Sequence, residues 1–178
     1  MPQTLRYVDA TKAPGPFRRA FSWIATTRVA LFISRHVSWK LDPVLLRLTR
    51  GRVASTLMIP TAVLETRGAR SGARRQNAVI YWQDGDRVII AASQAGSPRN
   101  PAWYYNAVAN PDVTFGGEAM RAEVVDDPTE QDRLWTLGDR VFPSFAVYRR
   151  RAGAAGRSIP LLHLRPTGKP VDGRPSTQ

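Results

Sequence analysis

The 178-residue chain contains no cysteine and only two histidines, His36 and His163. Disulfide bonds and thiolate metal sites are therefore excluded. Neither histidine belongs to a cluster with the spacing of metal ligands, so we predict that the protein binds no metal. A chain without cysteine suits a reducing compartment, and we expect a cytoplasmic location.

Long hydrophobic runs are also missing from the N-terminal part. The longest apolar stretch between residues 17 and 41 covers only residues 29–33, far too short to cross a bilayer. The sequence shows neither a signal-peptide core nor a convincing cleavage site. We therefore predict a protein without a membrane-spanning segment or a secretory leader.

Acidic residues are scarce in the first 75 positions, where 14 Lys and Arg stand against three Asp and Glu. The remaining residues contain 12 Lys and Arg and 11 Asp and Glu. The first 75 residues therefore carry +11 of the formal net charge of +12. Such a field attracts nucleic acid, anionic lipid or a polyanionic small ligand. Charge alone does not choose among these three partners.

The length and a hydrophobic content of 43% suit one domain with a real core. Residues 1–16 are rich in Pro and Gly and predict a flexible N-terminus, and residues 167–178 predict a disordered tail. Residues 17–54 predict a basic amphipathic helical arm. This arm either packs on the domain, covers a lipophilic pocket or contacts an anionic membrane peripherally, at the inner face of the cell membrane.

Residues 55–166 carry the pattern of the main domain. Apolar runs predict strands over residues 56–66, 77–82, 87–92, 113–115, 120–125 and 159–164. Asn100-Pro101 and Asp127-Pro128 have the chemistry of helix starts, with each polar residue as the N-cap. Several short strands with helices inserted late predict an α+β fold, a small antiparallel barrel with helices over its mouth.

The densest positive charge lies between the first two predicted strands. Four arginines and two glycines fall within residues 67–75, where the chain must reverse direction. Glycine allows the turn and leaves amides uncovered, while Arg70, Ser71 and Arg75 add donors suited to phosphate or carboxylate. The segment lacks the lysine and spacing of a P-loop, and no GxGxxG motif opens a helix. It is either an anion-binding hairpin or a solvated tip whose arginines protect a sheet edge.

Two further segments favour a ligand site. The small residues of segment 91–96 would let a flat ligand lie against the backbone, and the aromatic residues of segment 103–105 could wall it in. Each segment also has a plainer interpretation. Segment 91–96 could be a tightly packed strand end, and Trp103 could be an ordinary core residue. Together with the arginine hairpin they indicate a ligand site.

Over residues 55–166, the sequence resembles the deazaflavin (coenzyme F420)-dependent nitroreductase and quinone reductase family. The motifs that carry the resemblance are, in order, Gly68-Ala69-Arg70-Ser71-Gly72 with Arg75, Asn77, Asp84-Gly85, Ala91-Ala92-Ser93, Asn100-Pro101 with Trp103, Tyr104 and Asn106, Ala109-Asn110-Pro111, Phe142-Pro143-Ser144 and Ile159-Pro160.

The resemblance implies a split β-barrel of the FMN-binding, flavin reductase-like kind that binds coenzyme F420. It also implies hydride transfer from reduced F420 to a lipophilic acceptor such as a quinone, a nitroaromatic or an activated alkene. The phosphodiester and oligoglutamate tail of F420 match the basic hairpin and arm in charge.

The resemblance also assigns residues to the cofactor site. It implies that the phosphate and tail are held by Arg70, Ser71 and Arg75, and that the strand beside the ring presents Asn77, Ala78, Val79 and Ile80. It also implies that the ring is contacted by Ala91, Ala92, Ser93 and Gln94. The opposite side would be closed by Ala102, Trp103, Tyr104 and Asn106. Ser93 and Tyr148 are the candidate catalytic residues, as donors of a proton or hydrogen bond. Phe142 and Phe145 stand where nitroreductase members have tyrosines, which predicts a less polar pocket and disfavours nitroimidazole reduction.

Other functions stay open from the residues themselves. The same barrel can hold FMN, as a less favoured cofactor, or haem, and a member could store a cofactor without turnover. A basic nucleic-acid-binding module would explain the charge, but the arginines lie at a turn and no recognition helix is visible, so we expect no nucleic-acid partner. The sequence leaves the oligomeric state open.

Overall fold

The structure is a computed structural model that describes Leu5 and residues 59–168. Six strands form a closed antiparallel barrel in the order β1-β2-β3-β6-β5-β4, with β4 pairing back onto β1. The strands are β1 (Thr61–Arg67), β2 (Arg74–Asp84), β3 (Arg87–Ala91), β4 (Asp112–Phe115), β5 (Glu118–Val124) and β6 (Leu161–Pro166). The predicted arm, and the predicted flexible ends apart from Leu5, Thr167 and Gly168, lie outside the described residues.

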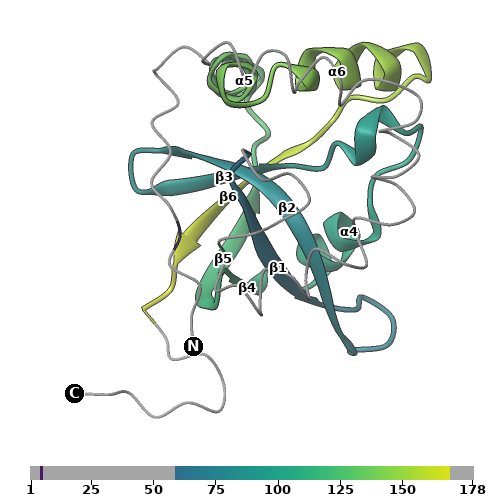
Figure 1. Ribbon diagram of the computed structural model, residues 1–178. Helices are drawn as coiled ribbons and strands as arrows, with labels where there is room; N and C mark the ends of the chain where they lie inside the picture. The colour runs from purple at the N-terminus through teal and green to yellow at the C-terminus, as the bar shows by residue number, and fades with distance from the viewer. Residues whose placement is uncertain (1–4, 6–58, 169–178) are drawn as a thin grey trace.

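Helices are inserted after the third and fifth strands. A short 3-10 turn, η2 (Gln94–Gly96), leads to α4 (Ala102–Ala109), and α5 (Pro128–Val141) and α6 (Ser144–Ala154) precede β6. Figure 1 shows α5 and α6 together across one end of the barrel, while α4 lies beside the barrel near β1. The predicted barrel with helices over its mouth is confirmed. Within the described residues, no helix has the length and apolar character needed to cross a membrane.

Two glycine turns set the hairpins of the first three strands. At the β1–β2 turn the amide of Gly68 donates to the carbonyl of Ala73 at 2.8 Å, and Gly72 adopts a φ of +64°. At the β2–β3 turn Gly85 also has a φ of +64°, a region that L side chains avoid. Both turns fall where the sequence predicted them.

Hydrophobic side chains from every strand fill the barrel, and an aromatic cluster joins it to α5 and α6. The indole of Trp82 on β2 lies 5.6 Å from the ring of Phe145 and 6.1 Å from that of Trp135, centroid to centroid. Gly138 of α5 gives Trp82 room, because a Cβ there would lie 3.0 Å from the indole. Burial of such large rings supplies much of the energy that holds the helices on the barrel.

The two predicted helix caps have different outcomes. Asp127 caps α5, its Oδ1 accepting from the amide of Thr129 at 3.0 Å, as predicted. The prediction that Asn100 caps α4 is wrong, because this helix begins after Pro101 without a side-chain cap. The Asn100 side chain instead accepts a hydrogen bond from Arg157. The half-buried Arg157 therefore takes the side-chain oxygen that would otherwise accept from the helix amides.

Candidate functional site

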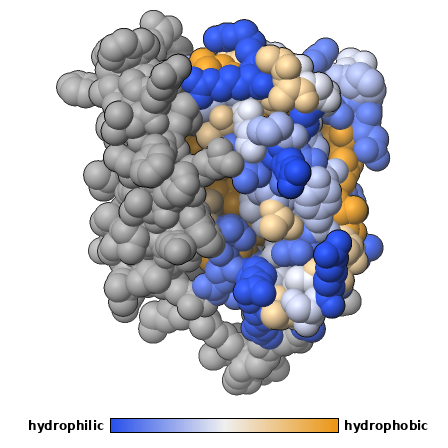
Figure 2. All heavy atoms as spheres, turned by 90° about the vertical axis from the view of Figure 1, so that its right-hand side faces the viewer, coloured by the Kyte–Doolittle hydropathy of each residue, from blue (hydrophilic) through white to orange (hydrophobic). Residues whose placement is uncertain are grey.

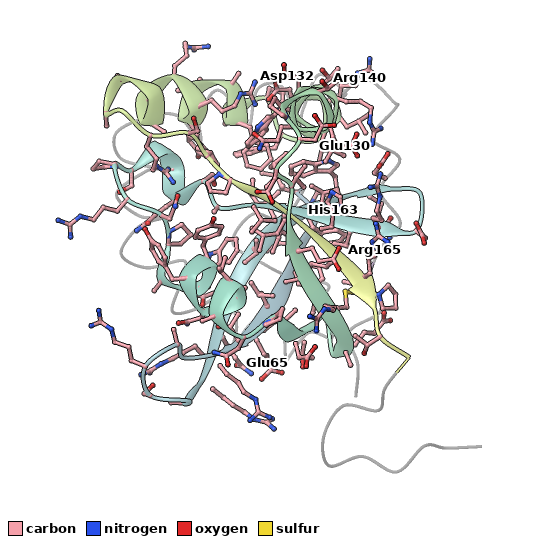
Figure 3. The ribbon with its side chains drawn as sticks, turned by 180° about the vertical axis from the view of Figure 1, so that it is seen from behind. Glu65, Glu130, Asp132, Arg140, His163 and Arg165 are labelled. Atoms are coloured by element: carbon pink, nitrogen blue, oxygen red, sulfur yellow. The ribbon has the colours of Figure 1, made fainter. Side chains whose placement is uncertain are left out.

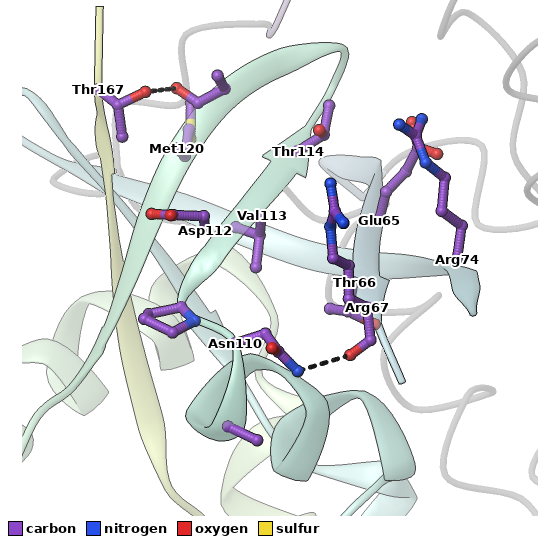
Figure 4. Close-up of a pocket in the computed structure, with 13 residues that line it drawn as sticks. Glu65, Thr66, Arg67, Arg74, Asn110, Asp112, Val113, Thr114, Met120 and Thr167 are labelled. Atoms are coloured by element: carbon purple, nitrogen blue, oxygen red, sulfur yellow. Dashed lines mark hydrogen bonds between the residues drawn. The ribbon is translucent and has the colours of Figure 1, made fainter. Parts of the chain in front are cut away.

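Helix α4 holds the arginine hairpin in place through two asparagine side chains. The Oδ1 of Asn106 accepts from the amide of Ala69 at 3.0 Å, and its Nδ2 donates to the Oγ1 of Thr66 at 3.4 Å. One turn later, the Nδ2 of Asn110 donates to the carbonyl of Arg67 at 3.3 Å (Figure 4). The turn is therefore bonded to a helix, unlike a freely solvated hairpin tip.

A groove of about 960 Å³ lies between this hairpin and α4. Seven of the residues predicted to bind the cofactor line it: Arg70, Ser71, Arg75, Asn77, Ala102, Trp103 and Asn106. Figure 2 shows this side of the molecule, with strongly hydrophilic side chains at the level of the hairpin. The structure thus brings together residues that are up to 36 positions apart in sequence, from Arg70 to Asn106.

The groove carries excess positive charge. Its lining contains Arg70, Arg74 and Arg75, all exposed, and no residue in the described part of the chain forms an ion pair or hydrogen bond with their guanidinium groups. Glu65 is the single carboxylate among the lining residues, and its Oε2 already accepts from Gln76 at 2.6 Å. Figure 3 places Glu65 at this end of the barrel and Glu130 at the other end, on α5. An anionic ligand would meet donors that are not already engaged.

The predicted ring-binding residues at the end of β3 lie outside the lining of this groove. Ala91 and Ala92 are buried, and the amide of Ala92 donates to the carbonyl of Pro160 at 3.0 Å. Ser93 precedes η2, in which Gln94 and Ala95 have φ values of +44° and +54°. Left-handed backbone at two adjacent non-glycine residues persists only where the surroundings hold it, and such strain clusters at functional sites.

Ala78, Val79, Ile80 and Tyr104, which were also predicted to contact the cofactor, are not among the residues that line the groove. Val79 is buried in the barrel, while Ala78 and Ile80 are half-buried and pack against hydrophobic side chains. Tyr104 is half-buried on α4, with its ring 5.4 Å from that of the exposed Tyr105. Burial raises the pKa of Tyr104 above its usual value. Contact of these four predicted residues with a cofactor stays a prediction.

Tyr148, one of the two candidate catalytic residues, is 6% exposed on α6. Its ring lies 5.8 Å from that of Phe142 and 6.4 Å from that of Phe145. Burial raises the pKa of the phenol to about 12, so it stays neutral and able to donate near neutral pH. Neither phenylalanine lines the groove, and both belong to the core. The less polar pocket predicted from them therefore gains no support at the groove.

Arg157, which the sequence analysis did not single out, is bonded to the end of β3, next to the predicted ring-binding residues. Its Nη1 donates to the carbonyl of Ala92 at 3.1 Å and to the Oδ1 of Asn100, and its Nη2 donates to the carbonyl of Ser93 at 2.9 Å. Burial lowers the pKa of this guanidinium. A single arginine after a glycine- and alanine-rich segment carries no sequence signal that distinguishes it from the exposed arginines around it.

Comparisons with known proteins identify the family. A sequence model described as F420H(2)-dependent quinone reductase matches residues 40–166, which is most of the chain. The chain belongs to this family. It is therefore an F420-dependent oxidoreductase, and its cofactor is coenzyme F420, as the sequence resemblance implied.

Individual relatives agree with this assignment. The enzyme is 33% identical over 147 residues to an F420H(2)-dependent quinone reductase of Mycobacterium tuberculosis, an alignment that covers 76% of this chain and 97% of the relative. A solved structure of an F420-H2 dependent reductase is 27% identical, with a TM-score of 0.52, covering 60% of this chain and 94% of its own. A second solved structure, described as a domain-swapped dimer, is 26% identical to this chain, with a TM-score of 0.54. The match covers 71% of this chain and 94% of that one.

The described residues of the enzyme fit its cofactor. The groove contains three guanidinium groups that no carboxylate in residues 59–168 pairs with. Such groups suit the phosphodiester and the glutamate carboxylates of F420. The indole of Trp103 and the methyl group of Ala102 give the same groove an apolar wall.

Proposed function

We propose that the enzyme binds F420H2 in the arginine groove and transfers a hydride to a lipophilic quinone. The single observation that carries this proposal is the groove itself, which is lined by three arginines that no carboxylate in the described residues pairs with and by Trp103 of α4. Reduction of quinones with F420H2 is the activity of the family to which the chain belongs. Nitroaromatics and activated alkenes are further acceptors that the sequence resemblance implies.

The roles of the residues follow from their positions. Arg70 and Arg75 bind the phosphate and tail through charge-assisted hydrogen bonds, and Ser71 adds a hydroxyl at the same turn. Asn106 positions the turn through its bond to Ala69. Trp103 forms a wall that excludes water from one side of the groove.

When bound, reduced F420 supplies the hydride, and one proton completes the two-electron reduction of the quinone to a quinol. Ser93 and Tyr148 are the side chains proposed to donate that proton or to stabilise the developing oxyanion. Tyr148 is protonated throughout the neutral range, as an ordinary phenol is, and burial extends this range by raising its pKa to about 12. A neutral phenol donates a hydrogen bond without requiring a change of pH.

The binding half of the proposal is tested with a double variant, Arg70→Ala with Arg75→Ala. We expect the dissociation constant for F420, measured by its fluorescence, to rise about tenfold or more because two charge-assisted bonds are lost. The matched control is Arg150→Ala with Arg165→Ala, which removes two exposed arginines outside the groove and leaves the same net charge. Equal affinity in the two double variants would exclude the groove as the site.

The catalytic half is tested with a panel of a quinone, a nitroaromatic and an enone, each at saturating F420H2. We expect oxidation of F420H2, followed by its absorbance, to be fastest with the quinone. Cofactor binding without turnover on any acceptor would contradict the proposed activity and would favour a cofactor-storing protein.

A further inference from the structure

Arg157 lies where three structural elements meet. It follows α6, and its backbone amide donates to the carbonyl of Ala152 in the last turn of that helix, at 2.9 Å. Its side chain bonds the carbonyls of Ala92 and Ser93 at the end of β3 and the side chain of Asn100 before α4. One guanidinium therefore joins both ends of the loop 93–100 to the end of α6.

The bridged loop has an unusual backbone that needs such support. Gln94 and Ala95 are both left-handed, with φ values of +44° and +54°. Gly96 follows with a φ of +76° and lies so close to α6 that a Cβ would stand 2.8 Å from the carbonyl oxygen of Tyr148. Arg157 bonds the chain immediately before the left-handed pair and again after it. The loop is thus held at its ends by a side chain and in its middle by close packing.

The same loop determines where α4 begins. Asn100 precedes the helix by two residues, and the far half of the helix is bonded to the hairpin through Asn106 and Asn110. The groove wall, Trp103, lies between these two attachments. A displacement at the Arg157 end would tilt the wall, while the hairpin end stays attached.

We propose that Arg157 is a positioning residue that fixes the loop 93–100 and the start of α4, and so sets the geometry of the ring end of the cofactor site. The inference rests on the proposed function, because it assigns the tail to the arginine hairpin and the ring to the Ser93 and Trp103 end. Arg157 does not line the groove, and it acts through the backbone of Ala92 and Ser93. A group that acts in this way affects hydride transfer more than it affects cofactor affinity.

The test uses the full chain with three variants. Arg157→Lys keeps the charge but cannot span three acceptors, and Asn100→Ala removes only the side-chain end of the bridge. The matched control is Arg149→Ala, another half-buried arginine of the same region. Arg149 lines a pocket together with Arg157, but it makes a two-pronged ion pair with Asp139 at 2.8 and 2.6 Å and stacks over Trp135. We expect its loss to destabilise the protein and to leave the bonds of Arg157 in place.

For Arg157→Lys we expect kcat for quinone reduction to fall about tenfold, and the dissociation constant for F420 to change less than about threefold. A misplacement of 1 Å at the reacting atoms costs up to about a hundredfold, and a smaller displacement correspondingly less. Asn100→Ala is expected to show the same split to a smaller degree. Arg149→Ala is expected to lower the melting temperature with kcat and affinity unchanged. A kcat unchanged in both Arg157→Lys and Asn100→Ala, at temperatures where they are folded, overturns the inference.

Hydrogen exchange separates this inference from the proposed function. The amides of Gly96 and Ser97 are bonded within the loop, to Ser93 at 2.9 Å and to Gln94 at 3.0 Å. In the absence of cofactor, we expect them to exchange faster in Arg157→Lys and in Asn100→Ala than in the wild type or Arg149→Ala. Unchanged exchange overturns the inference even if the wild type is active. An inactive wild type with the expected change in exchange contradicts only the proposed function.

Discussion

The side-chain oxygen of Asn106 accepts a hydrogen bond from the backbone amide of Ala69 at 3.0 Å, so a helix residue closes the turn that carries the arginines. The Nδ2 of the same side chain reaches Thr66, which is buried on β1. Both ends of the carboxamide are therefore engaged by the protein. The sequence resemblance implied that Asn106 contacts the cofactor, and the geometry adds a positioning role.

Asn106→Ala should loosen the hairpin and weaken cofactor binding. We expect the dissociation constant for F420 to rise about fivefold, which corresponds to a lost hydrogen bond of about 1 kcal/mol. The amide of Ala69 should exchange faster in the free protein, which a purely cofactor-contacting role would not predict. Asn110→Ala, which frees only the carbonyl of Arg67, serves as the comparison and should have the smaller effect.

Cofactor binding should weaken as salt is added. The groove arginines are exposed, and the attraction between exposed charges is screened within a Debye length of about 10 Å at 0.1 M salt. We expect the affinity for F420 to fall about tenfold between roughly 0.05 and 0.5 M sodium chloride. The double variant Arg70→Ala with Arg75→Ala should show a clearly shallower dependence. An equally steep dependence in that variant would place the tail elsewhere.

Tyr148→Phe should alter the alkaline stability of the protein. Burial raises the pKa of this phenol to about 12, so the unfolded chain ionises first, near pH 10. The wild type should therefore lose unfolding free energy as pH rises through about 10, by roughly 3 kcal/mol once the folded pKa is passed. In Tyr148→Phe, the unfolding free energy measured in urea should fall less over the same pH range, because the phenol is absent. Tyr105→Phe, at a side chain 54% exposed, is the control.

Activity measurements on the same variant test the proposed proton donor. If Tyr148 donates to the acceptor, its replacement by phenylalanine should lower kcat about tenfold or more at saturating F420H2. The loss should be constant between about pH 6 and 9, because the hydroxyl stays protonated throughout that range. Full activity in Tyr148→Phe would assign the role to Ser93 or to solvent.

Arg133→Ala should make the protein more sensitive to acid. Arg133 bonds Asp84 of the β2–β3 hairpin at 2.6 Å and Glu130 of α5 at 2.7 Å, and it holds the pKa of both carboxyls below their usual values. Stabilisation from a lowered carboxyl pKa is present above the unfolded pKa and is lost as pH falls through the folded one.

We therefore expect the acid-unfolding midpoint of Arg133→Ala, followed by circular dichroism, to lie at higher pH than that of the wild type. Arg121→Ala breaks the exposed pair with Asp112 and should leave the midpoint unchanged, since such pairs contribute little. A shift of the same size in both variants would mean that net charge, not the bridge to α5, sets acid stability.

Gly96→Ala should be the more damaging of two glycine substitutions. Both Gly96 and Gly85 have positive φ, but a Cβ at Gly96 would meet Tyr148 at 2.8 Å, while one at Gly85 would meet nothing within 4 Å. We expect Gly85→Ala to cost about 1 kcal/mol of unfolding free energy and Gly96→Ala about 2 kcal/mol more, by urea unfolding. Equal costs would show that α6 yields to the added methyl group.

The sequence predicted those parts of the fold that depend on local signals. The Asp84-Gly85 turn, the two strands around Gly116-Gly117 and the Asp127 cap are each specified by neighbouring residues, and each appears where expected. The start of α4 was misplaced because Asn100 serves a partner 57 residues away instead of the helix. No local rule contains that information.

The candidate site divides in the same way. The arginine turn and the aromatic helix are visible as charge and composition, and they meet in one groove. Arg157 could not be found, because its importance comes from burial and from three acceptors that lie far away in the sequence. Tyr148 was found through the resemblance, and its depth in the aromatic cluster became visible only in the structure.

The pairing of β4 back onto β1 has a consequence for assembly. Because the sheet returns to its first strand, free rows of backbone donors and acceptors are confined to segments that pair on one side, such as residues 74–80 of β2, which pair with β1 but not with β3. A neighbouring molecule could therefore add a strand only at such a segment, and elsewhere on the barrel its contacts would have to be made by side chains.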